Sequence, residues 1–422
     1  MSIFEERESE IRAYSRLYPV VFESSSNAMI KDEAGKEYID FFAGAGVLNF
    51  GHNNQAMKKA VIAHLEADGM THSLDLETTV KRTFMERFTE RVLEPRDMPH
   101  KMQFMGPTGT NAVEAALKLA RRVTGRHEIA AFQHGFHGMT LGSLACTANA
   151  VFRNASGVPL QNVRHYPFGC EPVCLGCTRG CGMEVLERLR AQYADTSSGV
   201  PAPAAFLVEP IQAEGGVNVA SKEWLHGLQE LAREIGALVI FDDIQAGMGR
   251  TGSFFSFDGM GLDPDIICLA KGLGGLGTPI AMNLVKPEHD QHWAPGEHTG
   301  TFRGQGLSFV AGTEGLDYFK DENLMDEVKR KSVKIFEALA PLEEHPEVQV
   351  RGKGMIAGLD LGNGERVKAV VHKCFEAGVM VCPCGTGGRV LKLIPPLTIP
   401  GDQLEAGLKI ITQAAGEVMQ QA

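Results

Sequence analysis

The chain has 422 residues, of which 44% are hydrophobic and 22% are charged, and its formal net charge is −11. This length allows two domains, each with a core of its own, and the composition is typical of α/β proteins. The acidic excess argues against a nucleic-acid surface or an anionic membrane as partner, so we expect a small-molecule ligand.

The beginning of the chain and its cysteines indicate a cellular compartment. The first residues, MSIFEERESEIR, are acidic and lack the basic start and apolar run of a signal peptide. No apolar run reaches the roughly 18 residues that suggest a membrane-spanning helix. The nine cysteines are an odd number, which fits reduced thiols better than a secreted disulfide framework. We therefore expect a cytoplasmic protein.

The N-terminal segment, residues 1–60, begins with a polar helical stretch and continues with a hairpin. Two strand-like runs, 28–31 and 37–41, flank the turn sequence Asp-Glu-Ala-Gly. The small residues at 43–46 would let the backbone approach another group closely, although tight packing explains them equally well.

A helix is predicted within residues 105–125, MGPTGTNAVEAALKLARRVTG. Asn111 and Glu114 form a variant of the capping box at its start, and Gly125 marks its end. One helical face is apolar, with Val113, Ala116, Leu117 and Ala120. The backbone N–H groups of Gly109, Thr110 and Asn111 would face an anion at the helix N-terminus, so this segment is a candidate phosphate site. An ordinary capped helix is the alternative, and this segment alone does not decide between them.

The loop after the next predicted strand, residues 128–133, contains His134, Phe136 and His137. Flanking glycines place the two histidines in a loop rather than on one helical face, which argues against a zinc site. Phe136 would either stack on a planar ligand or fill the core.

An insertion at residues 165–183 contains four cysteines spaced C-x3-C-x2-C-x3-C. They are Cys170, Cys174, Cys177 and Cys181. Such a group could bind structural zinc or an iron–sulfur cluster, but the spacing differs from the usual pair of C-x2-C knuckles. Free thiols and a redox-labile pair are the alternatives.

Polar side chains follow buried strands in the middle of the chain. The apolar run 237–241 leads directly into Asp242, and the run 265–270 leads into Lys271. Parallel strands bring their carboxyl ends to one edge of a sheet, where open α/β folds bind ligands. A lysine there, beside a carboxylate, is a candidate for Schiff-base chemistry. A solvated lysine before a glycine-rich loop is the ordinary alternative.

The pattern changes at about residue 307 to long helices joined to short strands. We therefore expect a large domain at residues 61–306 and a smaller C-terminal α/β domain at residues 307–422, joined by the N-terminal segment.

Seven motifs, in order along the chain, resemble those of the class III (ω-amino acid) aminotransferases. They are PTGTNAVEAALKLAR, FHGMTLG, VEPIQAEGG, FDDIQAGMGRTG, PDIICLAKGLGGLG, HTGTF and IPPLTI. The resemblance implies pyridoxal 5′-phosphate as cofactor and the α/β fold type I of aspartate aminotransferase. That fold has a large, mostly parallel seven-stranded sheet flanked by helices and a smaller α/β domain. The implied assembly is a homodimer with shared active sites, with a dimer of dimers as an alternative.

The resemblance also implies roles for individual residues. Lys271 would hold the cofactor and then move a proton between substrate and cofactor carbons, while Asp242 would keep the pyridine nitrogen protonated. Gln245 would approach the ring hydroxyl. The remaining implied contacts are Phe136 and Ile244 on the two ring faces, Gly109 and Thr110 at the phosphate, and Thr301 at the phosphate of the neighbouring subunit.

Within the family, the motifs look most like the diaminobutyrate:2-oxoglutarate aminotransferases of ectoine and related pathways. These exchange the 4-amino group of L-2,4-diaminobutyrate with glutamate, through L-aspartate 4-semialdehyde. The FxGR loop of the ornithine and 4-aminobutyrate branches reads FHGM here, and Lys392 replaces their arginine before the Pro-Pro pair. A buried substrate carboxylate needs a cation, so Arg303 or Lys392 is the candidate, with Glu209 or Glu214 as its partner when no carboxylate is bound.

Two features count against that branch: Leu76 and Glu77 stand where bulky aromatics are expected, and the four-cysteine insertion is not typical. One alternative is another ω-aminotransferase, acting on ornithine, 4-aminobutyrate, β-alanine or an amine, with pyruvate as a further acceptor. An aminomutase or racemase on the same fold is a second. A metal-binding or regulatory protein on an inactive fold is a third, and the presence of Lys271, Asp242 and Gln245 together argues against it.

Overall fold

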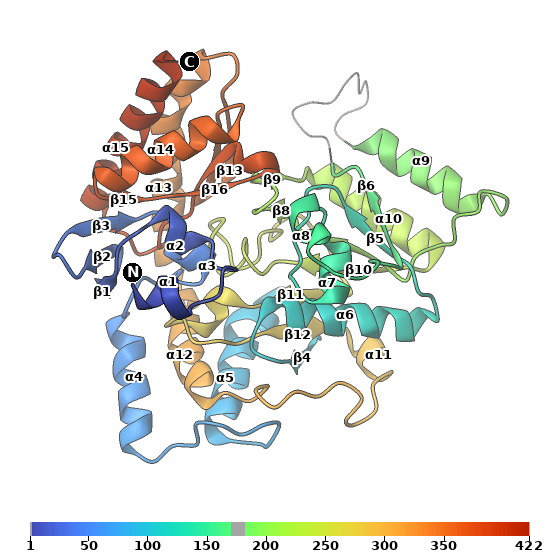
Figure 1. Ribbon diagram of the computed structural model, residues 1–422. Helices are drawn as coiled ribbons and strands as arrows, with labels where there is room; N and C mark the ends of the chain where they lie inside the picture. Colours follow the sequence, from blue (N-terminus) through green and yellow to red (C-terminus); the bar gives the residue numbers. More distant parts are fainter. Residues whose placement is uncertain (1, 170–181, 422) are drawn as a thin grey trace.

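The computed structural model describes residues 2–169 and 182–421, and Figure 1 shows how their elements are arranged. A seven-stranded sheet lies at the centre. In spatial order its strands are β4 (Lys101–Phe104), β12 (Met282–Val285), β11 (Ile266–Leu269), β10 (Leu238–Asp242), β7 (Ala205–Val208), β5 (Ile129–Phe132) and β6 (Val163–Tyr166). Of these strands, β12 alone runs antiparallel to its neighbours. The predicted fold class, with its large and mostly parallel seven-stranded sheet, is confirmed.

Successive residues of β10 point to opposite faces of this sheet. Leu238 and Ile240 belong to the apolar cluster that contains the buried side of α6 (Gly109–Thr124). Val239 and Phe241 belong to the cluster that contains the buried side of α10 (Lys222–Ile235). Because helices cover both faces, the strand is continuously apolar instead of alternating.

The helices on the two faces begin and end at recognisable capping residues. The backbone at Gly236 is left-handed and ends α10, as predicted. On the other face, α6 begins at Gly109, and Asn111 lies inside its first turn. The side-chain oxygen of Asn111 accepts from the backbone N–H of Thr108 at 3.2 Å. The predicted capping box of Asn111 and Glu114 is therefore wrong, because the helix begins earlier than the apolar pattern suggested.

The remaining helices of this part surround the sheet. α9 (Met183–Ala194) packs against α10, and α4 (Gln55–Glu66) and α5 (Thr79–Phe88) pack against α12 (Gly306–Leu316). Figure 1 shows the last three together below the sheet. The shorter elements are α7 (Leu141–Cys146), α8 (Ala150–Asn154), α11 (Pro287–Asp290), η1 (Thr89–Leu93), η2 (Glu94–Arg96), η3 (Lys271–Gly274) and η4 (Asp317–Phe319). None of the helices in the described ranges is long and apolar enough to span a bilayer.

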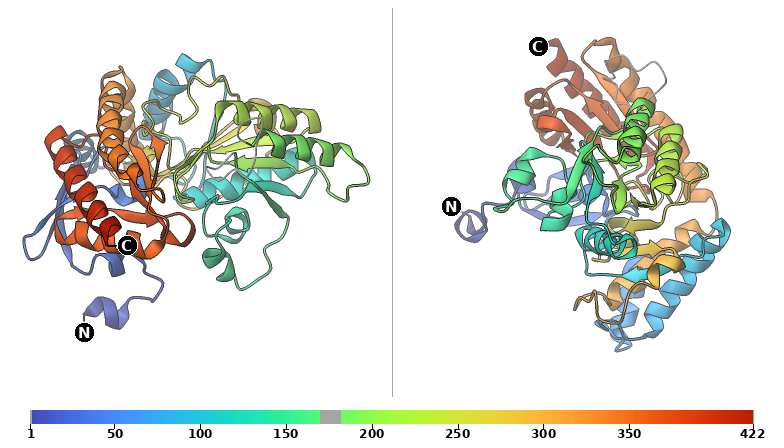
Figure 2. Two further views of the ribbon diagram at one scale, coloured as in Figure 1. Left: turned by 90° about the horizontal axis from the view of Figure 1, so that it is seen from above. Right: turned by 90° about the vertical axis from the view of Figure 1, so that its right-hand side faces the viewer.

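A second part of the structure combines the two ends of the chain, and both views in Figure 2 show it beside the central sheet. One sheet joins the N-terminal strands β1 (Phe22–Ser26), β2 (Met29–Asp32) and β3 (Glu37–Asp40) to β15 (Val379–Met380). The other has the order β13 (Gln349–Lys353), β14 (Ile356–Asp360), β17 (Val390–Leu393) and β16 (Cys382–Cys384). Strands β2 and β3 are the predicted hairpin.

Three long helices accompany these sheets: α13 (Asn323–Leu339), α14 (Gly364–Glu376) and α15 (Gly401–Gln420). The short elements of this part and of the connections are α1 (Ile3–Arg7), α2 (Tyr14–Leu17), α3 (Ala43–Gly46), β8 (Ile211–Gln212), β9 (Asn218–Val219), η5 (Ala340–Glu344) and η6 (Thr386–Gly388).

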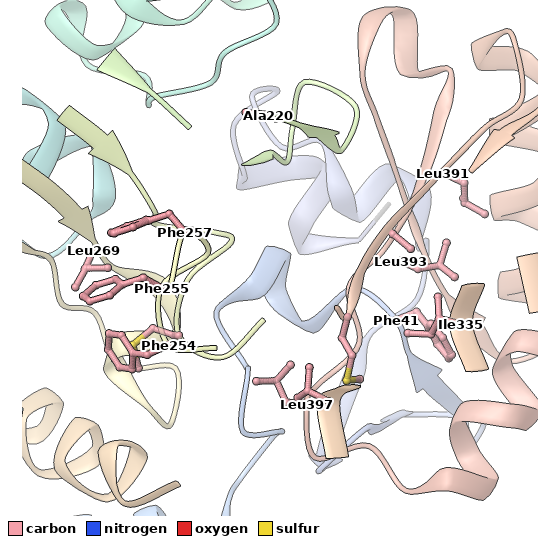
Figure 3. Packing of buried hydrophobic residues seen from close by; sticks show 14 of the residues in the cluster. Phe41, Ala220, Phe254, Phe255, Phe257, Leu269, Ile335, Leu391, Leu393 and Leu397 are labelled. Atoms are coloured by element: carbon pink, nitrogen blue, oxygen red, sulfur yellow. The ribbon is translucent and has the colours of Figure 1, made fainter. Parts of the chain in front are cut away.

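One apolar cluster crosses the boundary between the two parts. It contains Phe254, Phe255 and Phe257 beside the central sheet and Leu391 and Leu393 of β17, and Figure 3 shows both groups. The rings of Phe255 and Phe257 stack with their centroids 5.1 Å apart. A continuous close-packed core holds β17 in a defined position relative to β10, which matters because both strands contribute to the site described next.

Candidate active site

The ends of β10 and β11 bring Asp242 and Lys271 to the same edge of the central sheet. The two strands pair in parallel, with Asp242 opposite Cys268. Lys271 comes directly after Ala270, where β11 has ended. The predicted arrangement of a carboxylate and an amine on neighbouring strand ends is therefore observed, at the sheet edge where open α/β folds bind ligands.

Lys271 begins the short turn η3 with a φ of 50°. A non-glycine residue seldom adopts this left-handed conformation, so the surrounding structure must hold it there. Burial lowers the pKa of Lys271 to about 8, although the carboxylate of Glu214 acts in the opposite direction. An amine with this pKa is neutral in a useful fraction of molecules near neutral pH, as a nucleophile requires.

Asp242 is buried and accepts hydrogen bonds on both of its carboxylate oxygens. Oδ2 lies 2.8 Å from Nδ1 of His137, and Oδ1 accepts from the backbone N–H of Ile244 at 3.3 Å. Burial opposes a charge on His137, but the hydrogen bond and the charge of Asp242 raise the pKa of the histidine. The contact was not predicted from the sequence, although His137 follows β5 at the same sheet edge, which was the available signal.

Glu209, at the end of β7, is buried among backbone groups. Its two oxygens accept from the N–H groups of Phe136 at 2.9 Å and of Ala213 at 3.3 Å. Burial raises the pKa of Glu209 to about 7. Glu209 thus braces the loops that contain Phe136 and Ala213. Neither hydrogen bond of Glu209 involves Arg303 or Lys392, the two candidate cations for a substrate carboxylate.

Lys392 of β17 reaches into the site from the second part of the structure. Its Nζ bonds to Oε1 of Glu214 and lies 3.3 Å from Oε1 of Gln245. Burial opposes the charged form of this lysine, but Glu214 raises the pKa of Lys392 well above its ordinary value. Burial also disfavours the charge on Glu214, yet Lys392 and Lys271 hold the pKa of that carboxyl below its usual range.

The N-terminal segment completes this cluster through its backbone. Nε2 of Gln245 donates to Oε1 of Glu214 at 3.2 Å and to the carbonyl oxygen of Ala45 at 2.6 Å. Ala45 has a φ of 58°. A Cβ on Gly46 would lie 3.2 Å from Ile394 Cδ1, so this stretch approaches its neighbours closely, as its small residues predicted.

The N-terminus of α6 lies beside the loop that follows β10. A Cβ on Gly109 would lie only 2.8 Å from Cδ1 of Ile244, so a side chain at Gly109 would displace the side chain of Ile244. The hydroxyl oxygen of Thr110 is 2.7 Å from that of Thr140 and 2.5 Å from that of Ser143. Hydroxyls and unpaired N–H groups at a helix N-terminus form a suitable site for a phosphate.

Two further predicted cofactor contacts, Phe136 and Thr301, lie on loops around the sheet edge. The ring of Phe136 packs edge-on to Phe152 at a centroid distance of 5.5 Å. Thr301 is exposed, and its carbonyl oxygen accepts from Nε2 of His72 at 2.8 Å. A Cβ on the preceding Gly300 would lie 3.9 Å from the backbone nitrogen of Gly106, just before α6.

Arg303 lies in a different environment from Lys392. Its guanidinium is 3.3 Å from Asp75 and donates to the carbonyl oxygen of His298 at 3.0 Å. It lines a cavity of about 1250 Å³ between residues 77–104 and 290–303, and neither Lys271 nor Lys392 lines that cavity. The structure thus brings Lys392, and not Arg303, to Glu214.

The four cysteines considered as a metal site, Cys170, Cys174, Cys177 and Cys181, lie outside the described residues. Within residues 2–169 and 182–421, no group of three or more His, Cys, Asp or Glu side chains is arranged to hold a metal ion. The five described cysteines are buried free thiols.

Comparison with known proteins gives consistent results over the full chain. A diaminobutyrate–2-oxoglutarate transaminase of Sporosarcina pasteurii is 47% identical over 100% of this chain and 98% of its own length. One from Wolinella succinogenes is 48% identical, over 100% of this chain and 97% of its own length.

Comparison with solved structures also finds aminotransferases. The ornithine aminotransferase of Toxoplasma gondii superposes with a TM-score of 0.83 at 25% identity, covering 99% of this chain and 94% of its own. The family described as aminotransferase class-III matches residues 12–415. The chain belongs to the class-III aminotransferases, whose cofactor is pyridoxal 5′-phosphate.

Proposed function

We propose that this protein transfers the 4-amino group of L-2,4-diaminobutyrate to 2-oxoglutarate, giving L-aspartate 4-semialdehyde and glutamate. The observation that carries the proposal is the pair of lysines around Glu214: Lys271, with a lowered pKa, and the buried Lys392, paired with the carboxylate. Full-length relatives that are 43–48% identical and bear the name of this activity support the choice of substrate.

The side chains at the sheet edge fit pyridoxal phosphate. Lys271 offers an amine, Asp242 offers a carboxylate for the ring nitrogen, and Gln245 is the candidate partner of the ring hydroxyl. At the other end, a side chain at Gly109 would displace Ile244, and Thr110 adds a hydroxyl to the helix N-terminus for the phosphate. When bound, the cofactor supplies an aldehyde that links to amines and a ring that accepts electrons from the neighbouring carbon.

Lys271 has the properties of the proton carrier in this reaction. Its pKa of about 8 means that the side chain takes up and releases a proton without a large free-energy difference near neutral pH. Its backbone lies at the start of η3, directly after the end of β11, so its amine would be held at this edge of the sheet. The same group therefore both holds the cofactor and moves the proton.

Asp242 is held in place by its contact with His137. The histidine occupies Oδ2, and the backbone N–H of Ile244 occupies Oδ1, so the carboxylate is held in one orientation. An oriented carboxylate stabilises a proton on a ring nitrogen better than a mobile one does. Phe136 and Ile244 are the proposed covers of the two ring faces, one from each flanking loop.

Lys392 is the proposed binding group for a substrate carboxylate, with Glu214 as its partner between substrates. 2-Oxoglutarate and glutamate each carry a carboxylate at both ends, whereas diaminobutyrate carries an ammonium at its reacting end. When a carboxylate enters, Lys392 exchanges Glu214 for the substrate, and when it leaves, the ion pair re-forms, so the buried ammonium is never unpaired. Arg303 is not the proposed group, because it pairs with Asp75.

The proposed assembly is a homodimer in which Thr301 reaches the phosphate of the neighbouring subunit, with a dimer of dimers as the larger alternative. Exposure of Thr301 supports this arrangement, because the residue is accessible to a second subunit. The proposed setting is the cytoplasm, and ectoine biosynthesis is the proposed pathway. Mass determination in solution tests the proposed dimer, and the cofactor affinity of Thr301→Ala tests the proposed contact with the phosphate.

A donor and acceptor screen tests the proposed activity. The purified protein with pyridoxal phosphate is assayed with diaminobutyrate, ornithine, 4-aminobutyrate and β-alanine, each against 2-oxoglutarate and pyruvate. We expect the highest kcat/KM for diaminobutyrate with 2-oxoglutarate. A higher kcat/KM for another donor, or for pyruvate, would contradict the substrate assignment, and turnover without any keto acid would indicate an aminomutase or racemase.

A further inference from the structure

Three hydroxyl groups meet beside the N-terminus of α6, and we call Thr110, Thr140 and Ser143 the hydroxyl cluster. The Thr110 oxygen lies 2.7 Å from the Thr140 oxygen and 2.5 Å from the Ser143 oxygen, and the last two are 3.1 Å apart. Thr140 and Ser143 come from the start of α7, not from α6. The cluster therefore depends on the position of one helix relative to another.

The carboxylate of Glu114, one turn after Thr110 on α6, holds the start of α7 in that position. A single oxygen, Oε1, accepts from the hydroxyl of Thr140 at 2.6 Å and from the backbone N–H of Ser143 at 3.0 Å. The glycine between them is required for this contact, because a Cβ on Gly142 would lie 2.2 Å from Oε2 of Glu114. The carboxylate of Glu114 thus packs closely against the backbone of Gly142 in α7, in addition to its two hydrogen bonds.

The direction of the hydrogen bonds decides which hydroxyls can serve an anion. Each hydroxyl has one hydrogen, and that of Thr140 is donated to Glu114. Ser143 donates its hydroxyl hydrogen to the carbonyl oxygen of Thr140 at 3.0 Å. The hydroxyl oxygens of Thr140 and Ser143 can therefore only accept from Thr110, and the hydrogen of Thr110 is the one that remains for an anion. A phosphate that enters beside Thr110 needs donors, because it carries only acceptor oxygens.

We propose that Glu114 is a positioning residue for the cofactor phosphate: it braces Thr140 and Ser143 against Thr110 and so sets the affinity for the phosphate group. It does so through its hydrogen bonds, in spite of its negative charge. This inference depends on the phosphate site proposed above at Gly109 and Thr110. It adds a residue from the second turn of α6 to that site.

A substitution can separate hydrogen bonding from charge, because both bonds fall on one oxygen of Glu114. In Glu114→Gln the amide oxygen can accept from Thr140 and Ser143 as before, while the charge is lost. In Glu114→Ala both bonds are lost and the start of α7 is no longer braced. Thr140→Val removes one of the two bonds and keeps the side-chain volume.

The experiment measures binding of pyridoxamine 5′-phosphate and of pyridoxamine to the cofactor-free protein by titration calorimetry. Neither probe links covalently to Lys271, so the comparison isolates the phosphate. In Glu114→Ala we expect the dissociation constant of pyridoxamine 5′-phosphate to rise about tenfold. The dissociation constant of pyridoxamine should stay within about twofold, since loss of two charge-assisted bonds acts only at the phosphate end.

Glu114→Gln should stay within about threefold of the natural protein, and Thr140→Val should weaken phosphate binding in the same direction as Glu114→Ala. Glu234→Ala, which removes an exposed carboxylate paired with Arg190, is the matched control. If Glu114→Ala does not fold, judged by thermal melting of the cofactor-free protein, Thr140→Val decides by the same criteria.

Two results would overturn the inference. One is an unchanged affinity of Glu114→Ala for pyridoxamine 5′-phosphate, and the other is equal weakening in Glu114→Ala and Glu114→Gln, which would assign the effect to charge. The variant Thr110→Val distinguishes failure of the proposed role of Glu114 from failure of the proposed phosphate site. If Thr110→Val weakens binding and Glu114→Ala does not, only the role of Glu114 is lost; if the natural protein shows no preference for the phosphate ester, the site itself is wrong.

Discussion

Two lysines lie near the same carboxylate, Glu214, yet their pKa values are shifted in opposite directions. Lys271, from the central sheet, has its pKa lowered to about 8 by burial. For Lys392, from the second part of the structure, burial opposes the charged form, but the charge of Glu214, together with Cys382 and Cys384, raises the pKa well above the ordinary value. The comparison indicates that the charge of a carboxylate in direct contact, and not burial alone, separates an amine suited to chemistry from an ammonium suited to recognition.

The largest expected effect comes from removing the reactive amine. In Lys271→Ala we expect amino-group transfer to fall by at least about a thousandfold, because the group that holds the cofactor and moves the proton is lost. The measurement is glutamate formation from diaminobutyrate and 2-oxoglutarate under saturating cofactor. Activity within tenfold of the natural protein would show that Lys271 is not this group.

Removing the second amine should affect recognition instead. In Lys392→Met we expect kcat/KM for glutamate to fall about a hundredfold, mainly through KM, because a substrate carboxylate loses its charged partner. Steady-state kinetics with glutamate as donor provide the measurement. The double variant Lys392→Met with Glu214→Met should regain thermal stability but not the KM, since it removes the unpaired buried carboxylate without restoring a cation. A fall confined to kcat would argue against the recognition role.

A smaller effect is expected at the histidine that orients Asp242. In His137→Phe we expect kcat to fall about thirtyfold, because one oxygen of the buried carboxylate loses its hydrogen-bond donor. His137→Asn places an amide donor near the position of Nδ1 and should recover most of the loss. Equal kcat values in the two variants would mean that the ring fills space and the hydrogen bond does not contribute.

The pH dependence of the reactive amine tests the influence of Glu214 directly. Cofactor uptake by the cofactor-free protein requires neutral Lys271, so its rate should rise with pH and level off above a midpoint near pH 8. Glu214 raises the pKa of Lys271, so Glu214→Gln should move this midpoint to lower pH. The rate is followed by absorbance across a pH series. A midpoint that moves to higher pH would reverse the inferred sign of the interaction.

The smallest effect is expected at the cation that the structure separates from Glu214. In Arg303→Ala we expect the KM for glutamate to change by less than about threefold, because Arg303 pairs with the half-exposed Asp75. The same kinetic assay as for Lys392→Met provides the measurement. A rise in KM as large as that of Lys392→Met would assign carboxylate binding to Arg303.

The sequence by itself determined the frame of the site. Continuous apolar runs that end in Asp242 and Lys271 predicted buried parallel strands and a common edge, and both were observed. Apolar spacing predicted α6, although its first residue was misplaced. These features are local, because the spacing of apolar residues within a strand or helix indicates which of its faces is buried.

Only the tertiary structure decided which polar groups meet. The pairing of Lys392 with Glu214 joins residues 178 positions apart, and that of His137 with Asp242 joins residues 105 apart. From the sequence, Arg303 and Lys392 were equivalent cations, and Glu209 and Glu214 were equivalent acids. Periodicity carries no information about contacts between distant segments, because these depend on how strands are ordered in the sheets and how the two parts of the structure pack together.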